Sequence, residues 1–138
     1  MRPQGPIALL VVLLSALIGG LPAMASNHEE AKGEALVTVT VPDLTMPEQI
    51  GKALFEENCA SCHGKNAAGQ KDVAPPLIHI IYEPSHHGDI SFLLAAKQGV
   101  RAHHWPFGNM PPVPEVSDAE VKRITQYIRA VQRANGIF

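Results

Sequence analysis

Two cysteines and a histidine stand close together in the run Cys59-Ala60-Ser61-Cys62-His63. This C-x-x-C-H pattern is the attachment signature of a c-type haem. Two thiols about one helical turn apart can each add to one vinyl group of the haem, which forms two thioether bonds. His63 then follows below the porphyrin face, where a ring nitrogen can ligate the iron. The motif predicts one covalent haem c, attached through Cys59 and Cys62.

Three other kinds of site also contain a C-x-x-C pair. A thioredoxin-like redox pair needs a strand and then a helix, and no such pattern precedes Cys59. A structural zinc site usually takes four protein ligands, and the chain has no second cysteine pair. A structural disulfide would leave His63 and the downstream pattern without a role. Haem attachment is therefore the interpretation that we carry forward.

The second protein ligand of the iron is expected from the proline-rich loop 100–114. Met110 is followed by two prolines, which would restrict the loop that carries it. Met24 and Met46 lie in the N-terminal segment and at the first helix, so Met110 is best placed for the distal face. A thioether is a soft ligand that favours Fe(II) and raises the reduction potential relative to a second histidine. Ordinary packing is the alternative role for Met110.

Six further histidines compete with Met110. His103 and His104 are the nearest candidates for a bis-histidine haem. The pairs His86-His87 and His103-His104 could instead hold a second metal ion, but neighbouring side chains diverge, so one pair alone is a poor chelate. Solvated surface is the simpler interpretation of each pair. The six are His28, His79, His86, His87, His103 and His104.

A proline-rich segment, Ala74-Pro75-Pro76-Leu77, follows the motif. The carbonyl of Pro75 is expected to accept the free ring N–H of His63, which would set the tautomer and raise the basicity of the ligand. Leu77 is expected to pack on the haem. A plain surface turn is the alternative.

The first 25 residues are typical of a secretory signal peptide. Arg2 supplies the positive charge, residues 7–18 form an apolar run, and Ala23-Met24-Ala25 matches a cleavage site before Ser26. An uncleaved anchor is the alternative, but the run is short for a span of about 20 residues. We expect cleavage, export to the periplasm and no membrane span in the mature protein.

Residues 26–45 are expected to form an acidic and then extended tether that lies along the domain at 46–138. Three helices are predicted in that domain. The first has a capping box at Thr45 and runs into Cys59; the second runs from Asp89, as N-cap, to Gln98; and the last has a capping box at Ser117 and ends at Asn135-Gly136. Lys122, Arg123, Arg129 and Arg133 are expected on a solvated face of the last helix.

From about Pro47 to Asn135 the chain resembles the class I c-type cytochromes. That family has a glycine and, four residues later, an aromatic residue in its first helix, then C-x-x-C-H, a G-P-x-L-like segment, a methionine followed by proline, and an aromatic residue in its last helix. Ala74 replaces the usual glycine of the third element. The matching residues are Gly51 and Phe55; Cys59, Cys62 and His63; Ala74-Pro75-Pro76-Leu77; Met110 and Pro111; and Tyr127 with Ile128.

The resemblance implies an all-α fold of about three to five helices wrapped around one covalent haem, with the first and last helices crossed. It implies an electron carrier, not an enzyme, whose iron is held by His63 and Met110 and cycles between Fe(III) and Fe(II). Implied partners are redox proteins, a dehydrogenase as donor and an oxidase or reductase as acceptor. A haem enzyme subunit or a ligand sensor with a displaceable sixth ligand is the alternative function. By analogy, Trp105 would donate its indole N–H to a haem propionate or else pack in the core.

The charge of the chain argues against nucleic acid as a partner. The chain carries a formal net charge of -2, and from Met46 onward nine Lys and Arg balance nine Asp and Glu. Such a domain lacks the basic footprint of a nucleic-acid-binding protein and the lysine ring that steers some cytochromes to acidic partners. We expect a monomer.

Overall fold

The computed structural model describes Met1 and residues 33–138. The predicted signal peptide and the first residues of the predicted tether, up to residue 32, lie outside the described residues. The described part contains helices α1 (Met46–Asn58), α2 (Ala60–His63), α3 (Asp89–Gln98) and α4 (Asp118–Ala134), with the 3-10 turns η1 (Lys65–Ala67) and η2 (Ile80–Tyr82). Within these residues, strand pairing is limited to two isolated bridges. The predicted all-α fold is confirmed.

The helix ends follow from local sequence. The backbone N–H groups of Thr45 and Ser117 each donate to a glutamate three residues later at 2.8 Å, which closes the capping boxes that begin α1 and α4. The predicted N-cap of α3 is wrong by one residue, because Gly88 is the cap and Asp89 is the first helical residue. None of the described helices is long and apolar enough to cross a membrane.

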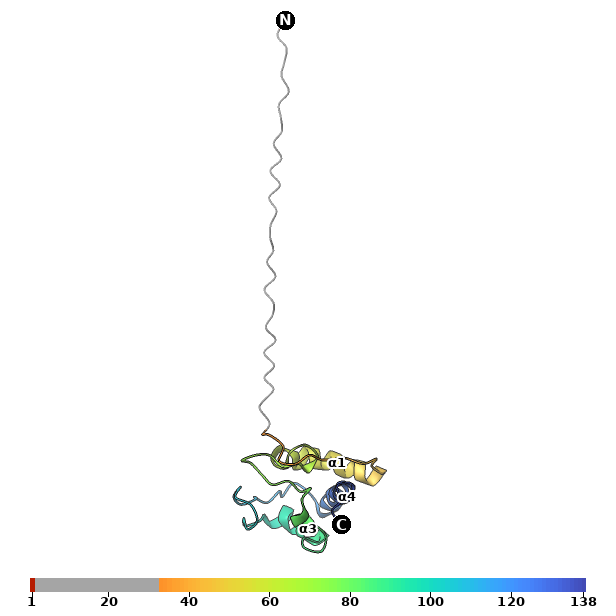
Figure 1. Ribbon diagram of the computed structural model, residues 1–138, viewed down its shortest axis with the longest axis vertical. Helices are drawn as coiled ribbons and strands as arrows, with labels where there is room; N and C mark the ends of the chain where they lie inside the picture. The colour runs from red at the N-terminus through yellow and green to blue at the C-terminus, as the bar shows by residue number, and fades with distance from the viewer. Residues whose placement is uncertain (2–32) are drawn as a thin grey trace.

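Helices α1 and α4 cross in close contact. Figure 1 shows α1 lengthwise and α4 nearly end-on, and these two helices share the most extensive contact of any pair of elements. Gly51 makes the contact possible: a Cβ atom added to it would lie 2.0 Å from the carbonyl oxygen of Arg123. The crossing point therefore requires a residue without a side chain.

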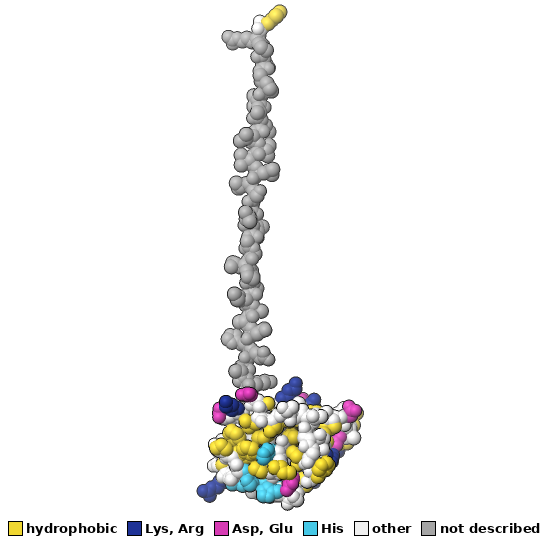
Figure 2. Space-filling model, viewed as in Figure 1, with side chains coloured by type: hydrophobic (Ala, Val, Ile, Leu, Met, Phe, Trp, Pro, Cys, Tyr) yellow, Lys and Arg dark blue, Asp and Glu magenta, His cyan; other side chains and the backbone are white. Residues whose placement is uncertain are grey.

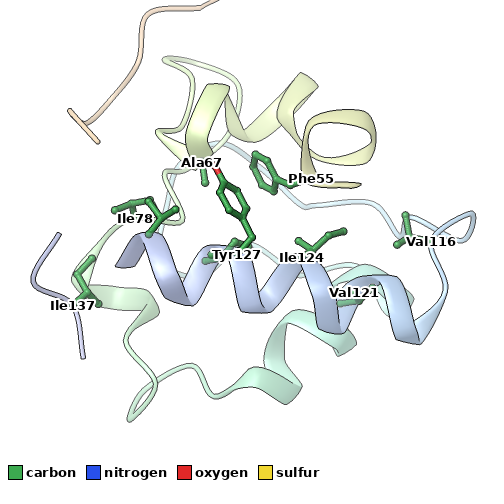
Figure 3. Packing of buried hydrophobic residues seen from close by; sticks show 10 residues of the cluster. Phe55, Ala67, Ile78, Val116, Val121, Ile124, Tyr127 and Ile137 are labelled. Carbon is green, nitrogen blue, oxygen red and sulfur yellow. The ribbon is translucent and has the colours of Figure 1, made fainter. Parts of the chain in front are cut away.

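Aromatic residues fill the space beside this crossing. Phe55 and Tyr127 are both fully buried, and their ring centroids lie 5.7 Å apart. Figure 3 shows the two rings meeting between the helices, with Ile124 on the same side of α4. An aromatic pair of this kind contributes about 0.5–1.5 kcal/mol beyond the area that it buries. The pair thus locks the orientation of α1 on α4.

An extended segment, residues 33–45, lies along the domain without joining a sheet. The backbone N–H of Leu36 donates to the carbonyl of Ala68 at 3.1 Å. Further along, the side chain of Asn135 binds both backbone groups of Thr40, at 2.9 and 2.7 Å. We call residues 33–45 the strap. It connects the beginning of the domain to the end of α4.

Arg129 is buried, so the expectation that it lies on a solvated face is wrong. Its side chain is only 9% exposed and donates to the Asp89 carboxylate at 2.8 Å. It also donates to the carbonyl of Tyr82 at 2.7 Å and to that of His87. The side-chain amide oxygen of Gln132 accepts another bond at 2.6 Å. One guanidinium group therefore holds the turn between η2 and α3 against α4.

Replacing Gly51 with alanine should destabilise the haem-loaded protein by about 2–3 kcal/mol, because the new methyl group would push α1 away from the backbone of α4. Thermal unfolding followed by circular dichroism measures the loss. Ala53→Ser, on the exposed side of the same helix, is the control and should change stability by less than about 0.5 kcal/mol. Equal melting temperatures for Gly51→Ala and the wild type would contradict the close crossing.

Arg129→Met should cost about 2–4 kcal/mol, since it keeps much of the side-chain volume but removes the donor to the carbonyl of His87 and leaves that of Tyr82 with the Gln132 amide alone. Urea unfolding measures the change. Arg123→Met provides a matched control on the exposed side of the same helix and should cost less than about 0.5 kcal/mol. If the two substitutions cost the same, Arg129 does not hold the turn.

Candidate functional site

The domain encloses a mostly apolar cavity of about 420 Å³. Its walls come from the end of α1, from α2, α3 and α4, and from the loops at 73–77 and 99–116. Figure 2 shows yellow hydrophobic side chains reaching the surface of the domain. All six residues that the sequence predicted for the site lie on the walls of this cavity: Cys59, Cys62, His63, Pro75, Leu77 and Met110. Their roles toward a haem stay predictions.

Helix α2 places the three motif side chains. Cys59 ends α1, with its backbone N–H donating to the carbonyl of Phe55 at 2.8 Å, and the N–H of His63 donates to the carbonyl of Cys59 at 2.9 Å. This single helical turn brings Cys59 and His63 to the same side of the chain. Gly64 then ends the turn with a φ of +74°, a backbone conformation that suits glycine.

The ring of His63 is oriented by the backbone. Its Nδ1 lies 2.9 Å from the carbonyl oxygen of Pro75. Because a carbonyl only accepts, Nδ1 carries the proton and Nε2 is left with its lone pair. Burial lowers the pKa of His63, while the bond to Pro75 opposes this shift. A neutral imidazole with a free Nε2 is the form that ligates a metal.

The surroundings of the two cysteines favour sulfur in an uncharged form. Cys59 is partly buried and Cys62 is exposed, and no disulfide joins them. Burial, assisted by the neighbouring Cys62, raises the pKa of the Cys59 thiol to about 11. A thiolate is therefore disfavoured at this wall of the cavity. A thioether, which carries no charge, fits the same position.

The loop that carries Met110 is closed onto the end of α3. Met110 and Val100 exchange two backbone hydrogen bonds, of 2.9 and 3.0 Å. Gly99 allows the approach, since a Cβ atom there would lie 2.5 Å from the carbonyl oxygen of Met110. The methionine is only partly exposed, whereas His103 and His104 in the same loop are exposed. The loop thus holds a thioether at the cavity wall.

The indole nitrogen of Trp105 provides a test of whether the cavity fits a haem. Within the described chain it is the one buried side-chain nitrogen or oxygen without a hydrogen bond of good geometry, and the side chain of Tyr82 is the polar group that approaches it. Leaving such a donor unpaired costs about 1–3 kcal/mol. Trp105 lines the cavity, and a haem propionate there would supply the missing acceptor. The orphan donor, the free Nε2 of His63 and the paired cysteines together fit the group that the motif implies.

Gln70 supports the motif, and our sequence analysis missed it. Its buried side-chain nitrogen donates to the carbonyls of Ala60 and Ser61, at 3.1 and 2.7 Å. Both carbonyls belong to α2, and that of Ala60 also accepts from the backbone N–H of Gly64 at 3.0 Å, so the bond at 2.7 Å to the Ser61 carbonyl is the main contribution of Gln70. In the sequence, Gln70 stands in a polar loop with no local pattern to distinguish it. Only the fold of residues 64–70 brings it under the motif.

Gln70→Ala should lower the free energy of unfolding of the haem-loaded protein by about 1–3 kcal/mol, because the Ser61 carbonyl loses its side-chain donor and the Ala60 carbonyl keeps only the N–H of Gly64. Guanidinium unfolding followed by haem absorbance measures the loss. The control is Gln49→Ala, which removes a single exposed amide-to-carbonyl bond of 2.9 Å and should cost less than about 1 kcal/mol. If both variants lowered the free energy of unfolding by the same amount, Gln70 would not support the motif as we describe.

Comparison with known proteins agrees with this geometry. The family model described as "Cytochrome c" matches residues 48–132. The chain is 31% identical over 133 residues to the Cbb3-type cytochrome c oxidase subunit CcoP of Rhodobacter capsulatus, a match that covers 94% of this chain and 44% of the relative. It is 34% identical over 79 residues to the cytochrome bc1 complex cytochrome c subunit of Mycobacterium tuberculosis, covering 57% of this chain and 25% of the relative.

The chain spans less than half the length of each of these curated relatives. The family match extends over more than half of the chain and includes the paired cysteines, His63 and the Met110 loop. From the motif, the cavity that surrounds it and this match, we conclude that the chain belongs to the cytochrome c family of electron carriers and that its cofactor is covalent haem c.

Proposed function

We propose that the haem iron is held by His63 and Met110 and that the chain passes single electrons between protein partners. The observation that carries this proposal is one apolar cavity whose walls include both the C-x-x-C-H turn and the closed loop around Met110. When bound, the haem supplies one-electron exchange between Fe(III) and Fe(II). The chain supplies two fixed ligands, which keeps the change in structure between the two oxidation states small.

The positioning residues have separate tasks in this proposal. Cys59 and Cys62 hold the haem through thioethers, and the carbonyl of Pro75 keeps Nε2 of His63 available by binding Nδ1 at 2.9 Å. Leu77, partly buried on the cavity wall, packs on the haem and excludes water. Exclusion of water from the iron strengthens its electrostatic interaction with the protein.

Met110 is favoured over the two loop histidines as the second ligand. His103 and His104 also line the cavity, but both are exposed, whereas Met110 is only partly exposed. Nε2 of His104 lies 3.4 Å from Nε2 of His86. Met110 has no competing polar contact, and its thioether suits a carrier that must stabilise Fe(II).

A carrier is favoured over a haem enzyme or ligand sensor. Ligation by both His63 and Met110 would leave no position on the iron free for substrate or gas. The relatives are cytochrome c subunits of a cbb3-type oxidase and a bc1 complex, which supports a role beside respiratory redox proteins. Our proposed partners are a dehydrogenase as electron donor and an oxidase or reductase as acceptor, with the chain as a free monomer or as the electron-transfer subunit of such a complex.

The proposed location is the periplasm. Residues 1–25 would act as a cleaved signal peptide, residues 26–45 as a tether and residues 46–138 as the cytochrome c domain. Export accounts for the haem attachment, because thioether formation in such proteins is completed outside the bacterial cytoplasm. In this arrangement the mature protein has no membrane span.

Met110→Ala tests the ligand assignment on periplasmically matured protein. The ferric wild type should show a weak far-red absorption band from sulfur-to-iron charge transfer, and the variant should lose it and bind CO in the ferrous state. His103→Ala and His104→Ala are the controls and should retain the band.

If Met110→Ala left the spectrum unchanged and His103→Ala or His104→Ala altered it, histidine ligation would replace our assignment. Tight CO binding by the wild type itself would favour the sensor or enzyme function.

A further inference from the structure

Four histidines from two separate segments meet at the surface beside the cavity. His86 and His87 lie in the turn before α3, and His103 and His104 lie in the loop before Met110. The ring centroids of His86 and His104 are 5.3 Å apart, and those of His87 and His104 are 5.2 Å apart. Figure 2 shows cyan histidine side chains gathered on one part of the domain, next to hydrophobic ones. The fold therefore joins two pairs that the sequence showed only as separate dipeptides.

The nitrogens of three of these histidines are spaced for a metal ion. One ring nitrogen from each of His86, His87 and His104 lies within 4.8 Å of the other two. Nε2 of His86 is 3.4 Å from Nε2 of His104. A tetrahedral zinc ion with Zn–N bonds of about 2.0–2.1 Å separates its ligand nitrogens by about 3.4 Å. The observed pair already has the separation that such an ion requires.

Backbone contacts orient the ligand nitrogens. Nδ1 of His87 donates to the carbonyl of Ile81 at 2.7 Å, which leaves its Nε2 with a free lone pair. Metal-ligating histidines in proteins nearly always make such a bond through the other ring nitrogen. The turn that carries His87 is itself held by the buried Arg129, whose guanidinium donates to the His87 carbonyl. One ligand of the set is thus fixed before any metal arrives.

We propose that His86, His87 and His104 form a site for a borderline divalent transition-metal ion, Zn²⁺ or Cu²⁺. Imidazole nitrogens suit both ions, and the fourth position is left to water or to His103, whose ring centroid is 4.1 Å from that of His104. None of the three proposed ligands is assigned to the haem. His87 and His104 also line the haem cavity. The proposal therefore rests on the assignment of Met110, and not His104, to the iron.

The test is a titration of the ferric, haem-loaded protein with ZnCl₂ by isothermal calorimetry. Both cysteines of this protein are bound to the haem as thioethers, so they do not compete for zinc. We expect one Zn²⁺ per molecule. His86→Gln and His104→Gln should each weaken binding by at least about tenfold. Ser85→Ala, an exposed neighbour in the same turn, is the matched control and should bind zinc as the wild type does.

Each variant is first compared with the wild type by its visible haem spectrum, so that loss of zinc binding is not mistaken for loss of the fold. X-ray absorption at the zinc edge should then show nitrogen neighbours at about 2.0 Å. Zinc binding that is equally tight in the His86→Gln/His104→Gln double variant would overturn the proposal. A wild type that binds no zinc would overturn it as well.

Discussion

The contact between the backbones of α1 and α4 is the constraint on which the rest of the domain depends. At Gly51 the two helices approach so closely that a single methyl group would overlap the carbonyl of Arg123. The C-x-x-C-H turn follows directly from α1, so the crossing decides where the turn stands relative to α4. The Phe55–Tyr127 pair fixes the rotation of α1 about this point. The cavity exists because the crossed helices hold one wall while loops supply the others.

The loops that form the other walls are held by side chains that bind the backbone. Gln70 donates to two carbonyls of α2, His63 donates to the carbonyl of Pro75, and Arg129 donates to carbonyls at the turn before α3. The one charged group among them, Arg129, is paired with Asp89 away from the cavity, so the loops are placed without a charge at the cavity wall. The surroundings of the iron can thus be apolar although the loops that form them are rich in polar residues.

Sequence predicted the helices well and named residues that line one cavity, because the signals of both are local. Capping boxes that span four residues mark the starts of α1 and α4, and the motif occupies five consecutive residues. The contacts of Gln70 and Arg129 are made with partners that are distant along the chain. The sequence around each residue therefore contains no pattern that predicts these contacts. The same reason explains the histidines: a divergent pair such as His86-His87 is a poor chelate until folding adds a residue from another segment. Asp89 likewise resembled a cap, and its carboxylate binds Arg129 instead.

The strap determines how the domain responds to tension. Glu34 and Leu36 share backbone hydrogen bonds with Lys71 and Ala68, in the loop just after the haem-attachment turn. A force applied to the chain at residue 33 therefore acts first on these hydrogen bonds. It acts next on the bonds between Thr40 and Asn135 at the end of α4, and only afterwards on α1. The strap therefore shields the crossing at Gly51 from a force that acts on the chain at residue 33.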